Sequence, residues 1–480
     1  MRSSKISTPK TILFAILCLF MIKGLILSLL MPALQNPDEQ IHYGTVQYLA
    51  EPLPRNWPIQ DIKKRTTNAA DISTYGLSEE IIRSAQSVQF DEIKFEKQNI
   101  QDFSADESAV MRDWKHYIDT YPINVSGTKS IYYLVASSTE KIFAQQDIFT
   151  RIFLSRFIAV IFGLGVVFLA YLIAKKIGLS EQIALLFTAI VAFQPMFSIT
   201  AAQVNIDIAL VFAFSLFLYA GACILKDGLN TKNALLALFA ALLGFFSKGP
   251  GMILIVMLYP LFAWGAYQLL KLPKKQFLIR FVGMTILLFV LAFLIIPKSY
   301  FIDITRSSTQ SQFHSPLISI AEYLNKTLSI GELRDTSLSY WGHFGWLDHA
   351  LPDWSLSIII ILTITGFLGA LWYLFSRQHA PYLPERRFLV FFLGMILTLQ
   401  IAIRFYDWRV FDYTGQILIG QPGRYFLPNI IAHLLTIITG LAFLLRETIR
   451  FYLLMKILAL AMILLQLHAI FNVIIPRYYL

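Results

Sequence analysis

Long hydrophobic runs dominate this chain and limit it to folds that a membrane can hold. About eleven runs approach or reach the length, about 20 apolar residues, that a helix needs to cross a bilayer. Of the 480 residues, 56% are hydrophobic and 15% are charged, against roughly 25% charged in a soluble globular domain. We therefore expect an all-α polytopic membrane protein, folded as a single membrane domain over residues 1–480. The runs lie near residues 11–31, 152–174, 182–200, 206–225, 233–247, 250–270, 277–297, 355–376, 388–405, 427–445 and 452–475.

Basic residues in the short connections indicate how the bundle is oriented across the membrane. If the runs alternate across the membrane, every basic cluster falls on the side of the N-terminus, which the positive-inside rule makes cytoplasmic. The same bias explains the net charge of +10 without nucleic acid, so no nucleic-acid partner is expected. The residues concerned are Arg2, Lys5, Lys10, Lys175, Lys176, Lys226, Lys232, Lys271, Lys274, Lys275, Arg377, Arg386, Arg387, Arg446 and Arg450.

Two long loops then fall on the external face, over residues 32–150 and 298–354. Loops this long are usually functional or disordered. Within the first, segment 129–147 has the pattern of an amphipathic helix at the membrane interface, so this loop is expected to carry juxtamembrane helices. Cys18 and Cys223 both lie inside hydrophobic runs, which argues against a disulfide framework or a cysteine-based metal site.

Charged and aromatic residues gather at the external ends of the runs. A charge at the middle of a bilayer costs about 2.5–3.5 kcal/mol on insertion scales, so such residues are candidates for function. All of them share one face under a single topology, which supports one common site. The candidates are Asp38, Glu39, His42, Asn205, Asp207, Lys248, Trp341, Asp348 and Arg424.

Each candidate also has a purely structural interpretation. Asn36 can cap a helix that has Pro37 at its first position and two acids in its first turn. Asp207 can cap the run at 206–225, and Lys248 can extend to the lipid headgroups. The tryptophans near residue 341 can belong to an interfacial aromatic belt. The sequence alone leaves both interpretations open.

The functional interpretation joins an acid with two cations. Asp38 and His42 are four residues apart and would share one helix face, where a carboxylate could take the proton of an attacking hydroxyl group. Lys248 and Arg424 could hold a departing phosphate, for which the arginine fork is well suited. No cofactor is predicted, although a divalent cation held by Asp38, Glu39 and His42 remains an alternative.

Several segments together resemble a known family. They occur in order as Pro37-Asp38-Glu39-Gln40-Ile41-His42, Gln194-Pro195-Met196-Phe197, Asn205-Ile206-Asp207, Ser247-Lys248-Gly249-Pro250, Trp341-Gly342-His343-Phe344-Gly345-Trp346-Leu347-Asp348 and Gly423-Arg424-Tyr425-Phe426-Leu427-Pro428. With them the chain resembles membrane glycosyltransferases of the GT-C superfamily, and more closely the DUF2142 group of bacterial membrane proteins. The Trp341–Asp348 and Gly423–Pro428 segments are the more specific.

This resemblance implies a GT-C-like bundle and an inverting glycosyltransferase. Such an enzyme moves a sugar from a polyprenyl-phosphate donor to a surface glycan, lipid or protein, on the periplasmic face of the bacterial inner membrane. Carried over, Asp38 is the general base, and Glu39 is its helper or a ligand of the acceptor or of a metal. Lys248 and Arg424 contact the donor phosphate. The other candidate residues are expected to bind substrate.

The chain departs from the family pattern at two points. Lys248-Gly249-Pro250 replaces a Lys-Pro-Pro type of sequence, and the chain ends at Leu480, after its last run, where many GT-C members carry a soluble external domain. Acceptor recognition is therefore expected from the two long loops. A secondary transporter, suggested by the interruption at 247–251, and a polysaccharide polymerase or ligase are the competing functions.

Overall fold

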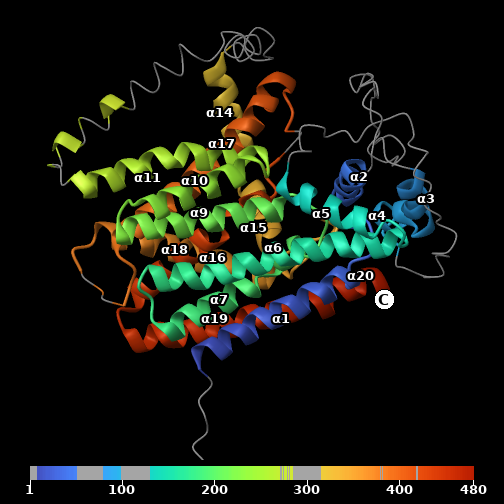
Figure 1. Cartoon of the computed structure of the whole chain (residues 1–480), viewed down its shortest axis with the longest axis horizontal. Coiled ribbons are helices and arrows are strands. Elements are labelled where there is room, and N and C mark those ends of the chain that lie inside the picture. Colours follow the sequence, from blue (N-terminus) through green and yellow to red (C-terminus); the bar gives the residue numbers. More distant parts are fainter. Residues whose placement is uncertain are drawn as a thin grey trace, which may run out of the picture.

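The structure is a computed structural model that describes residues 8–50, 79–98, 130–270, 315–378, 382–417 and 420–480, with Ala380 and parts of 273–284. Most helices lie along one long axis and form an elongated bundle (Figure 1). In chain order the elements are α1 (Pro9–Leu30), α2 (Glu39–Ala50), α3 (Glu79–Ser87), α4 (Phe90–Lys94), α5 (Ile131–Ile142), α6 (Ile148–Lys176), α7 (Glu181–Ala192), α8 (Pro195–Thr200), α9 (Asp207–Asp227), α10 (Thr231–Phe245), η5 (Gly249–Gly251), α11 (Met252–Leu270), α14 (Pro316–Thr327), α15 (Ile330–Trp341), β1 (His343–Phe344), β2 (His349–Ala350), α16 (Asp353–Phe375), α17 (Arg386–Thr414), η6 (Gly423–Asn429), α18 (Ile430–Leu445), α19 (Thr448–His468), η7 (Ala469–Ile474) and α20 (Ile475–Tyr479).

The all-α polytopic membrane class is confirmed, but the count of eleven spanning helices is not supported. Among the described residues, eight helical segments are long and apolar enough to cross a membrane. Two further expected spans are short helices of 12 and 15 residues, α7 and α10, and most of 277–297 lies outside the described residues. The eight are Pro9–Leu30, Ile148–Lys176, Asp207–Asp227, Gly249–Leu270, Asp353–Phe375, Arg386–Thr414, Gly423–Leu445 and Thr448–Tyr479.

The hydrophobic run at 182–200 is divided into two helices at Pro195. Helix α7 ends at Ala192, and the Gln194 side chain then caps α8 by accepting the backbone N–H of Phe197. Pro195 occupies the first turn of α8, the position in which its missing N–H costs nothing. The single hydrophobic run therefore folds as two helices.

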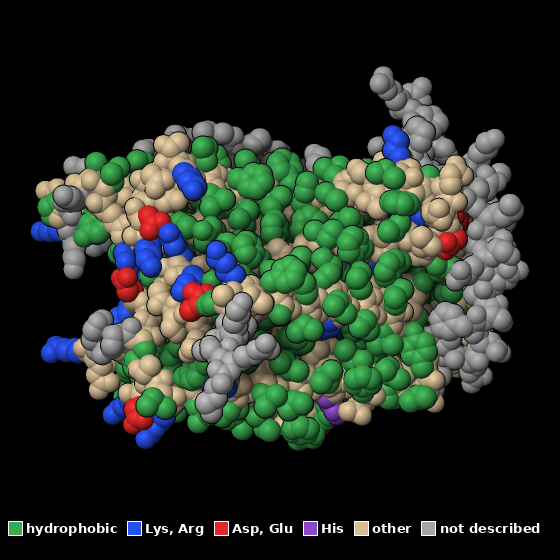
Figure 2. Space-filling view, turned by 60° about the horizontal axis from the view of Figure 1, so that its bottom comes forward, with side chains coloured by type: hydrophobic (Ala, Val, Ile, Leu, Met, Phe, Trp, Pro, Cys, Tyr) green, Lys and Arg blue, Asp and Glu red, His purple; other side chains and the backbone are tan. Residues whose placement is uncertain are grey.

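Basic side chains gather at one end of the bundle, while apolar side chains cover its middle (Figure 2). At this end Lys176 pairs with Asp227, which joins the ends of α6 and α9. Arg387, near the start of α17, donates to the Leu225 carbonyl at 2.7 Å. The basic connections thus lie together, as the sequence predicted. We call this the basic end; its assignment to the cytoplasm remains a prediction.

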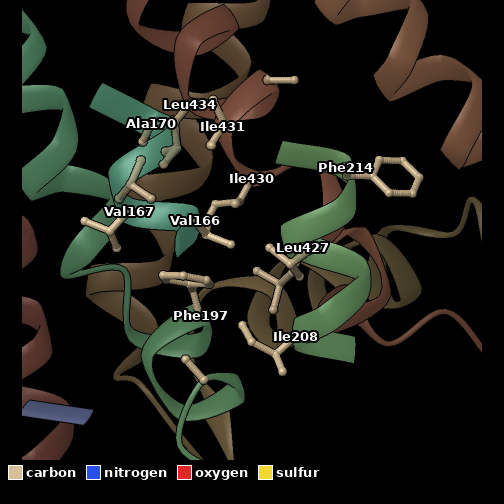
Figure 3. Packing of buried hydrophobic residues seen from close by; sticks show 14 of the residues in the cluster. Val166, Val167, Ala170, Phe197, Ile208, Phe214, Leu427, Ile430, Ile431 and Leu434 are labelled. Atoms are coloured by element: carbon tan, nitrogen blue, oxygen red, sulfur yellow. The ribbon is translucent and has the colours of Figure 1, made fainter. Parts of the chain in front are cut away.

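Helix α9 and the segment Gly423–Leu445, made of η6 and α18, form the centre of the bundle, with 83% and 94% of their most apolar stretches buried. Helices α6 and α8 pack apolar side chains against them (Figure 3). Helices α16 and α18 meet along glycines: a Cβ on Gly440 would lie 1.8 Å from the Gly366 carbonyl oxygen. Such close backbone contact is typical of helix packing in membranes, where small residues permit tight van der Waals contact.

The opposite end carries the described parts of the two long loops. Helices α2 to α5 belong to the first loop, and α5 lies within the expected amphipathic segment. The second loop contains α14, α15 and a short hairpin in which His343 pairs with Ala350. Residues 51–78, 99–129 and 298–314 of these loops lie outside the described residues.

Candidate functional site

A tight turn between α1 and α2 presents the first candidate, Asp38. Its backbone is left-handed, with φ +61°, a conformation that Asp adopts more readily than most residues. Its carbonyl oxygen accepts the N–H groups of Ile41 and His42, each at 3.0 Å. Asp38 itself thus precedes the first helical residue, and α2 begins at Glu39, two residues later than the expected start at Pro37. The Asp38 carboxylate remains 52% exposed.

The neighbouring Glu39 has the opposite environment, because it is buried against Arg156 of α6. Two Arg156 nitrogens, Nε and Nη2, donate to its two carboxylate oxygens at 2.8 and 2.6 Å. The backbone N–H of Val204 and the Asn36 side chain also donate to this carboxylate, at 3.0 and 3.1 Å. Glu39 therefore has the contacts of a structural residue.

Arg156 also holds the end of α1. Its Nη1 and Nη2 groups donate to the carbonyl oxygens of Ser28, Met31 and Pro32 at 2.6 to 2.9 Å. Together with the two bonds to Glu39, these contacts use all five N–H donors of the guanidinium group. The turn that carries Asp38 is thereby fixed from both sides, which explains how the left-handed backbone is maintained.

A second buried arginine, Arg151, precedes Arg156 on α6 and ties the helices of the first long loop together. It pairs with Glu80 of α3 and Glu140 of α5. Tyr43 of α2 donates to Glu140 at 3.0 Å, and Gln47 of α2 donates to Glu80 at 2.7 Å. This network fixes α2 and α5 against the start of α6.

The second acid of the site, Asp207, begins α9. Asn205 caps this helix by accepting the N–H of Ile208 at 3.0 Å, so the Asp207 carboxylate is not needed as a cap. It lies 2.5 Å from the Nζ atom of Lys248, which stands just before the 3-10 turn η5 that separates α10 from α11. The interruption of the hydrophobic run at η5 thus places the Lys248 side chain beside Asp207.

Arg424 of η6 supplies a second cation and is mostly buried, with 12% of its side chain exposed. Its Nη2 atom lies 3.7 Å from the Asp38 Oδ2 atom, too far for a hydrogen bond. Its Nε group is buried and has no hydrogen-bond partner within the part of the chain that the structure describes. A buried guanidinium donor left unpaired is costly, so this group is a candidate for binding an anion.

Arg424 faces a cavity of about 690 Å³ that also contains Asp207 and Lys248. The remaining walls are mostly apolar and come from α11 and α17. Several wall residues are more than half exposed on the outside of the bundle, so the cavity opens sideways, toward the space that lipid occupies. These exposed wall residues are Met252, Val256, Ile401, Phe405 and Tyr406.

His42 lies among the charged groups. Its Nδ1 atom is 2.5 Å from the hydroxyl oxygen of Tyr133 in α5. Burial lowers the pKa of His42 from 6.5 to about 4; Asp38 and Asp207 oppose this shift, while Lys248 and Arg424 add to it. The ring therefore stays neutral near pH 7. The structure thus brings together five of the nine candidates, Asp38, His42, Asp207, Lys248 and Arg424, which we call the charged cluster.

Asp348 and Trp341 belong to other surroundings. Asp348 pairs with Arg477 of α20 and with His349, both at 2.7 Å. Its pKa falls to about 2, because these two partners outweigh the effect of burial. Trp341 is buried at the end of α15 and lines a separate apolar cavity of about 440 Å³. Neither contributes to the larger cavity.

Sequence reasoning missed Tyr133 and the two buried arginines. A signal for the arginines was available, because Arg151 and Arg156 stand at the start of a hydrophobic run, where a charge needs a partner. Tyr133 carries no comparable signal. Among the described residues, no group of three or more His, Cys, Asp or Glu side chains could hold a metal ion, and Glu39 is instead paired with Arg156.

Comparison with known proteins agrees with the membrane architecture. No curated protein matches the chain. A family model with the description "Predicted membrane protein (DUF2142)" matches residues 20–435, which include all five members of the charged cluster. The chain therefore belongs to the DUF2142 family of membrane proteins.

Proposed function

We propose that this protein is an inverting glycosyltransferase that takes a sugar from a polyprenyl-phosphate donor. The observation that carries the proposal is the cavity of about 690 Å³ with two cations, Lys248 and Arg424, at its polar end and apolar walls open to lipid. A lipid phosphate has the matching shape: an anionic head next to a hydrocarbon chain. Cations placed at the head and apolar side chains along the tail would bind both parts at once.

The charge balance favours a donor with one phosphate. Lys248 is already neutralised by Asp207 at 2.5 Å, while Arg424 stands 3.7 Å from Asp38 and retains an unpaired donor. A sugar phosphodiester carries a single negative charge, which Arg424 can match. When the bond to the sugar breaks, the phosphate gains a second charge, and these preorganised donors would stabilise it in the transition state.

Asp38 is suited to act as the base. Its carboxylate is half exposed and adjacent to Arg424, whereas Glu39 is buried against Arg156. In the proposed step, a hydroxyl oxygen of the acceptor attacks the anomeric carbon, the bond to the phosphate oxygen breaks, and the hydroxyl proton passes to Asp38. Polyprenyl phosphate leaves, and the anomeric configuration inverts. The acceptor is a surface glycan, lipid or protein.

The charged cluster lies at the end of the bundle opposite the basic end. If the positive-inside rule holds, the basic end and the N-terminus are cytoplasmic and the reaction takes place on the external face. In bacteria this is the periplasmic side of the inner membrane. Cysteine labelling at positions 38 and 424 tests this orientation: labelling from the cytoplasmic side at either position would contradict it.

A transfer assay in proteoliposomes tests the proposed activity. Polyprenyl phosphates that carry different sugars are offered as donors, and mass spectrometry follows the appearance of free polyprenyl phosphate and glycosylated product. We expect one donor to be consumed by the wild-type protein and not by Asp38→Asn. Asp353→Asn is the matched control, since Asp353 pairs with Arg334 and is 76% exposed. Equal transfer by Asp38→Asn and wild type would refute the assignment of the base.

The helix interruption around Lys248 is the one observation that favours a transporter, because broken helices form the ion sites of many transporters. The same proteoliposomes distinguish the two functions. Movement of an intact glycosylated lipid or sugar across the membrane, without cleavage of the phosphate bond, would favour transport. A polymerase or ligase would instead transfer a preassembled oligosaccharide to the acceptor.

A further inference from the structure

The cavity that Arg424 faces is lined by one acid as well as by two cations. Asp207, Lys248 and Arg424 are the charged residues in its described lining. Near pH 7 they carry one negative and two positive charges, so the lining has a net charge of +1. The acid therefore halves the positive charge that the two cations alone would offer to a ligand.

The Asp207 carboxylate is directed to Lys248 and is not used to cap its own helix. Asn205 caps α9 by accepting the N–H of Ile208, while the Asp207 carboxylate lies 2.5 Å from the Lys248 Nζ atom. Both side chains keep some exposed surface, 17% for Asp207 and 29% for Lys248, and both line the cavity. A ligand in the cavity therefore meets the charges of both partners.

The two cations are brought together by the ring of Tyr425. The Lys248 Nζ atom lies 4.8 Å from the centroid of this ring, and the Arg424 Cζ atom lies 5.6 Å from it, both within the range of a cation–π contact. A phosphate bound to Arg424 would therefore also feel the Lys248–Asp207 pair. Asp38 is half exposed and does not line the cavity, so solvent screens its charge more strongly.

Charge is a stronger filter for phosphate number in this cavity than volume is. The volume of about 690 Å³ lies within the usual range of ligand sites, about 300–1,000 Å³, and a second phosphate adds little to a lipid that carries a sugar. Two unit charges about 6–10 Å apart, at an effective dielectric constant of about 20, change an equilibrium constant about 10- to 100-fold. A diphosphate-linked sugar would bring two negative charges to a lining with a net charge of +1.

We propose that Asp207 is a specificity-determining residue, whose carboxylate disfavours diphosphate-linked lipids by leaving the cavity with one uncompensated positive charge. The inference rests on the proposed function, because it assumes that a lipid phosphate occupies the cavity. Asp207 then acts by repelling the wrong ligand, which is a common source of specificity. The proposed transfer step keeps the same balance, because the phosphate gains a negative charge while the incoming proton neutralises Asp38.

Binding of two bare lipids tests the role of Asp207 without knowledge of the sugar. Polyprenyl phosphate and polyprenyl diphosphate of the same chain length are titrated into the protein in detergent at low salt. The wild type should prefer the monophosphate. Asp207→Asn keeps the shape of the side chain and removes its charge, so the ratio of the two dissociation constants should move about 10- to 100-fold toward the diphosphate.

Two single variants control for the change of charge. Asp207→Glu keeps the carboxylate and should retain the preference of the wild type. Asp353 also stands in the first turn of a spanning helix, α16, and pairs with Arg334, but it does not line the cavity. Asp353→Asn should therefore leave the ratio unchanged. A wild-type ratio in Asp207→Asn, or an equal shift in Asp353→Asn, would overturn the proposal.

A double variant separates the charge of Asp207 from its shape. Asp207→Asn combined with Lys248→Gln leaves Arg424 as the charged residue of the described lining, so the net charge is again +1. Its preference should return to the monophosphate, although both lipids bind more weakly. Continued preference for the diphosphate would contradict selection by charge. This variant also leaves no unpaired lysine, so it provides the test if Asp207→Asn folds poorly.

The same titrations distinguish failure of this inference from failure of the proposed function. If the wild type binds neither lipid, the cavity is not a site for lipid phosphates, and the proposed function is refuted together with this inference. If the wild type binds the monophosphate and the ratio does not change in Asp207→Asn, only the role of Asp207 is wrong. A wild type that prefers the diphosphate would likewise refute exclusion by charge.

Discussion

Arg156 and Arg424 both lie at the end of the bundle opposite the basic end, and both are mostly buried, yet their donors are used very differently. Arg156 makes five hydrogen bonds of 2.6 to 2.9 Å to Glu39 and to the end of α1. Arg424 has a buried Nε group without a partner among the described residues, and its nearest described carboxylate oxygen is 3.7 Å away. A saturated guanidinium stabilises the protein, whereas an unsaturated one is available to a ligand.

The adjacent acids Asp38 and Glu39 repeat this difference. Glu39 has no exposed side-chain surface and is saturated by Arg156, Asn36 and the backbone of Val204. Asp38 is half exposed beside Arg424. Two residues that share charge and chemistry in the sequence therefore have different surroundings: Glu39 holds the turn, and Asp38 lies beside Arg424, which lines the cavity.

The largest effect is expected from Arg156→Met, which removes the arginine whose donors are all used. The change removes the charged partner of Glu39 and the donor to three backbone carbonyls, and removal of one partner of a buried ion pair costs about 3–5 kcal/mol. We expect loss of folded protein, measured as a large fall in thermal stability in detergent. Arg334→Met is the control, because Arg334 is 54% exposed. Wild-type stability of Arg156→Met would mean that the turn does not depend on this arginine.

Asp38→Asn tests the proposed role of Asp38 as the base. We expect about a 10²- to 10⁴-fold lower transfer rate, the usual range for loss of a general base, with almost unchanged thermal stability. Asparagine suits this position because it also tolerates a left-handed backbone. Glu39→Gln should behave in the reverse way, with a large loss of stability. If both substitutions changed the same property, the division between the two acids would be wrong.

Arg424→Gln is expected to have a smaller effect, on binding rather than folding. Hydrogen bonds to a charged group contribute about 1.5–3 kcal/mol, so the affinity for polyprenyl phosphate should fall about 10- to 150-fold. Thermal stability should stay the same or rise, because a buried donor without a hydrogen-bond partner is removed. Isothermal titration with bare polyprenyl phosphate measures the first effect. A large loss of stability would place Arg424 with Arg156 as a structural residue.

The smallest of the predicted effects is that of acid on the ion pair between Asp348 and Arg477. The folded-state pKa of Asp348 is lowered from 3.8 to about 2, so this carboxylate adds stability above pH 4 that is lost as the pH falls toward 2. The contribution is about 2 kcal/mol. Asp348→Asn should therefore lower thermal stability at pH 7 and have little effect near pH 2. An equal difference at both values would exclude ionisation as the cause.

Hydropathy and the placement of basic residues were enough to predict the membrane class, the basic end and most of the spans. The prediction also placed Asp38, Asp207, Lys248 and Arg424 on one face, where the structure brings them together. It counted 182–200 as one span, because hydropathy does not reveal that Gln194 and Pro195 start a new helix.

Contacts between distant residues account for what the sequence could not show. Glu39 and Arg156 are 117 positions apart, and nothing local to Asp38 and Glu39 indicates which acid is buried. Asp348 was grouped with the site because it lies in a characteristic segment, but Arg477, 129 positions later, holds it. Tyr133 could be recognised only after α5 was packed on α2.

If a lipid phosphate binds as proposed, the sideways opening of the cavity between α11 and α17 determines how binding depends on the length of the lipid. Hydrocarbon beyond the exposed residues Val256 and Ile401 would lie in the bilayer both before and after binding. Burial of apolar surface gives about 0.8 kcal/mol per CH₂ only when that surface leaves water. Added prenyl units would therefore bring no further affinity, and the protein would accept carriers of different lengths.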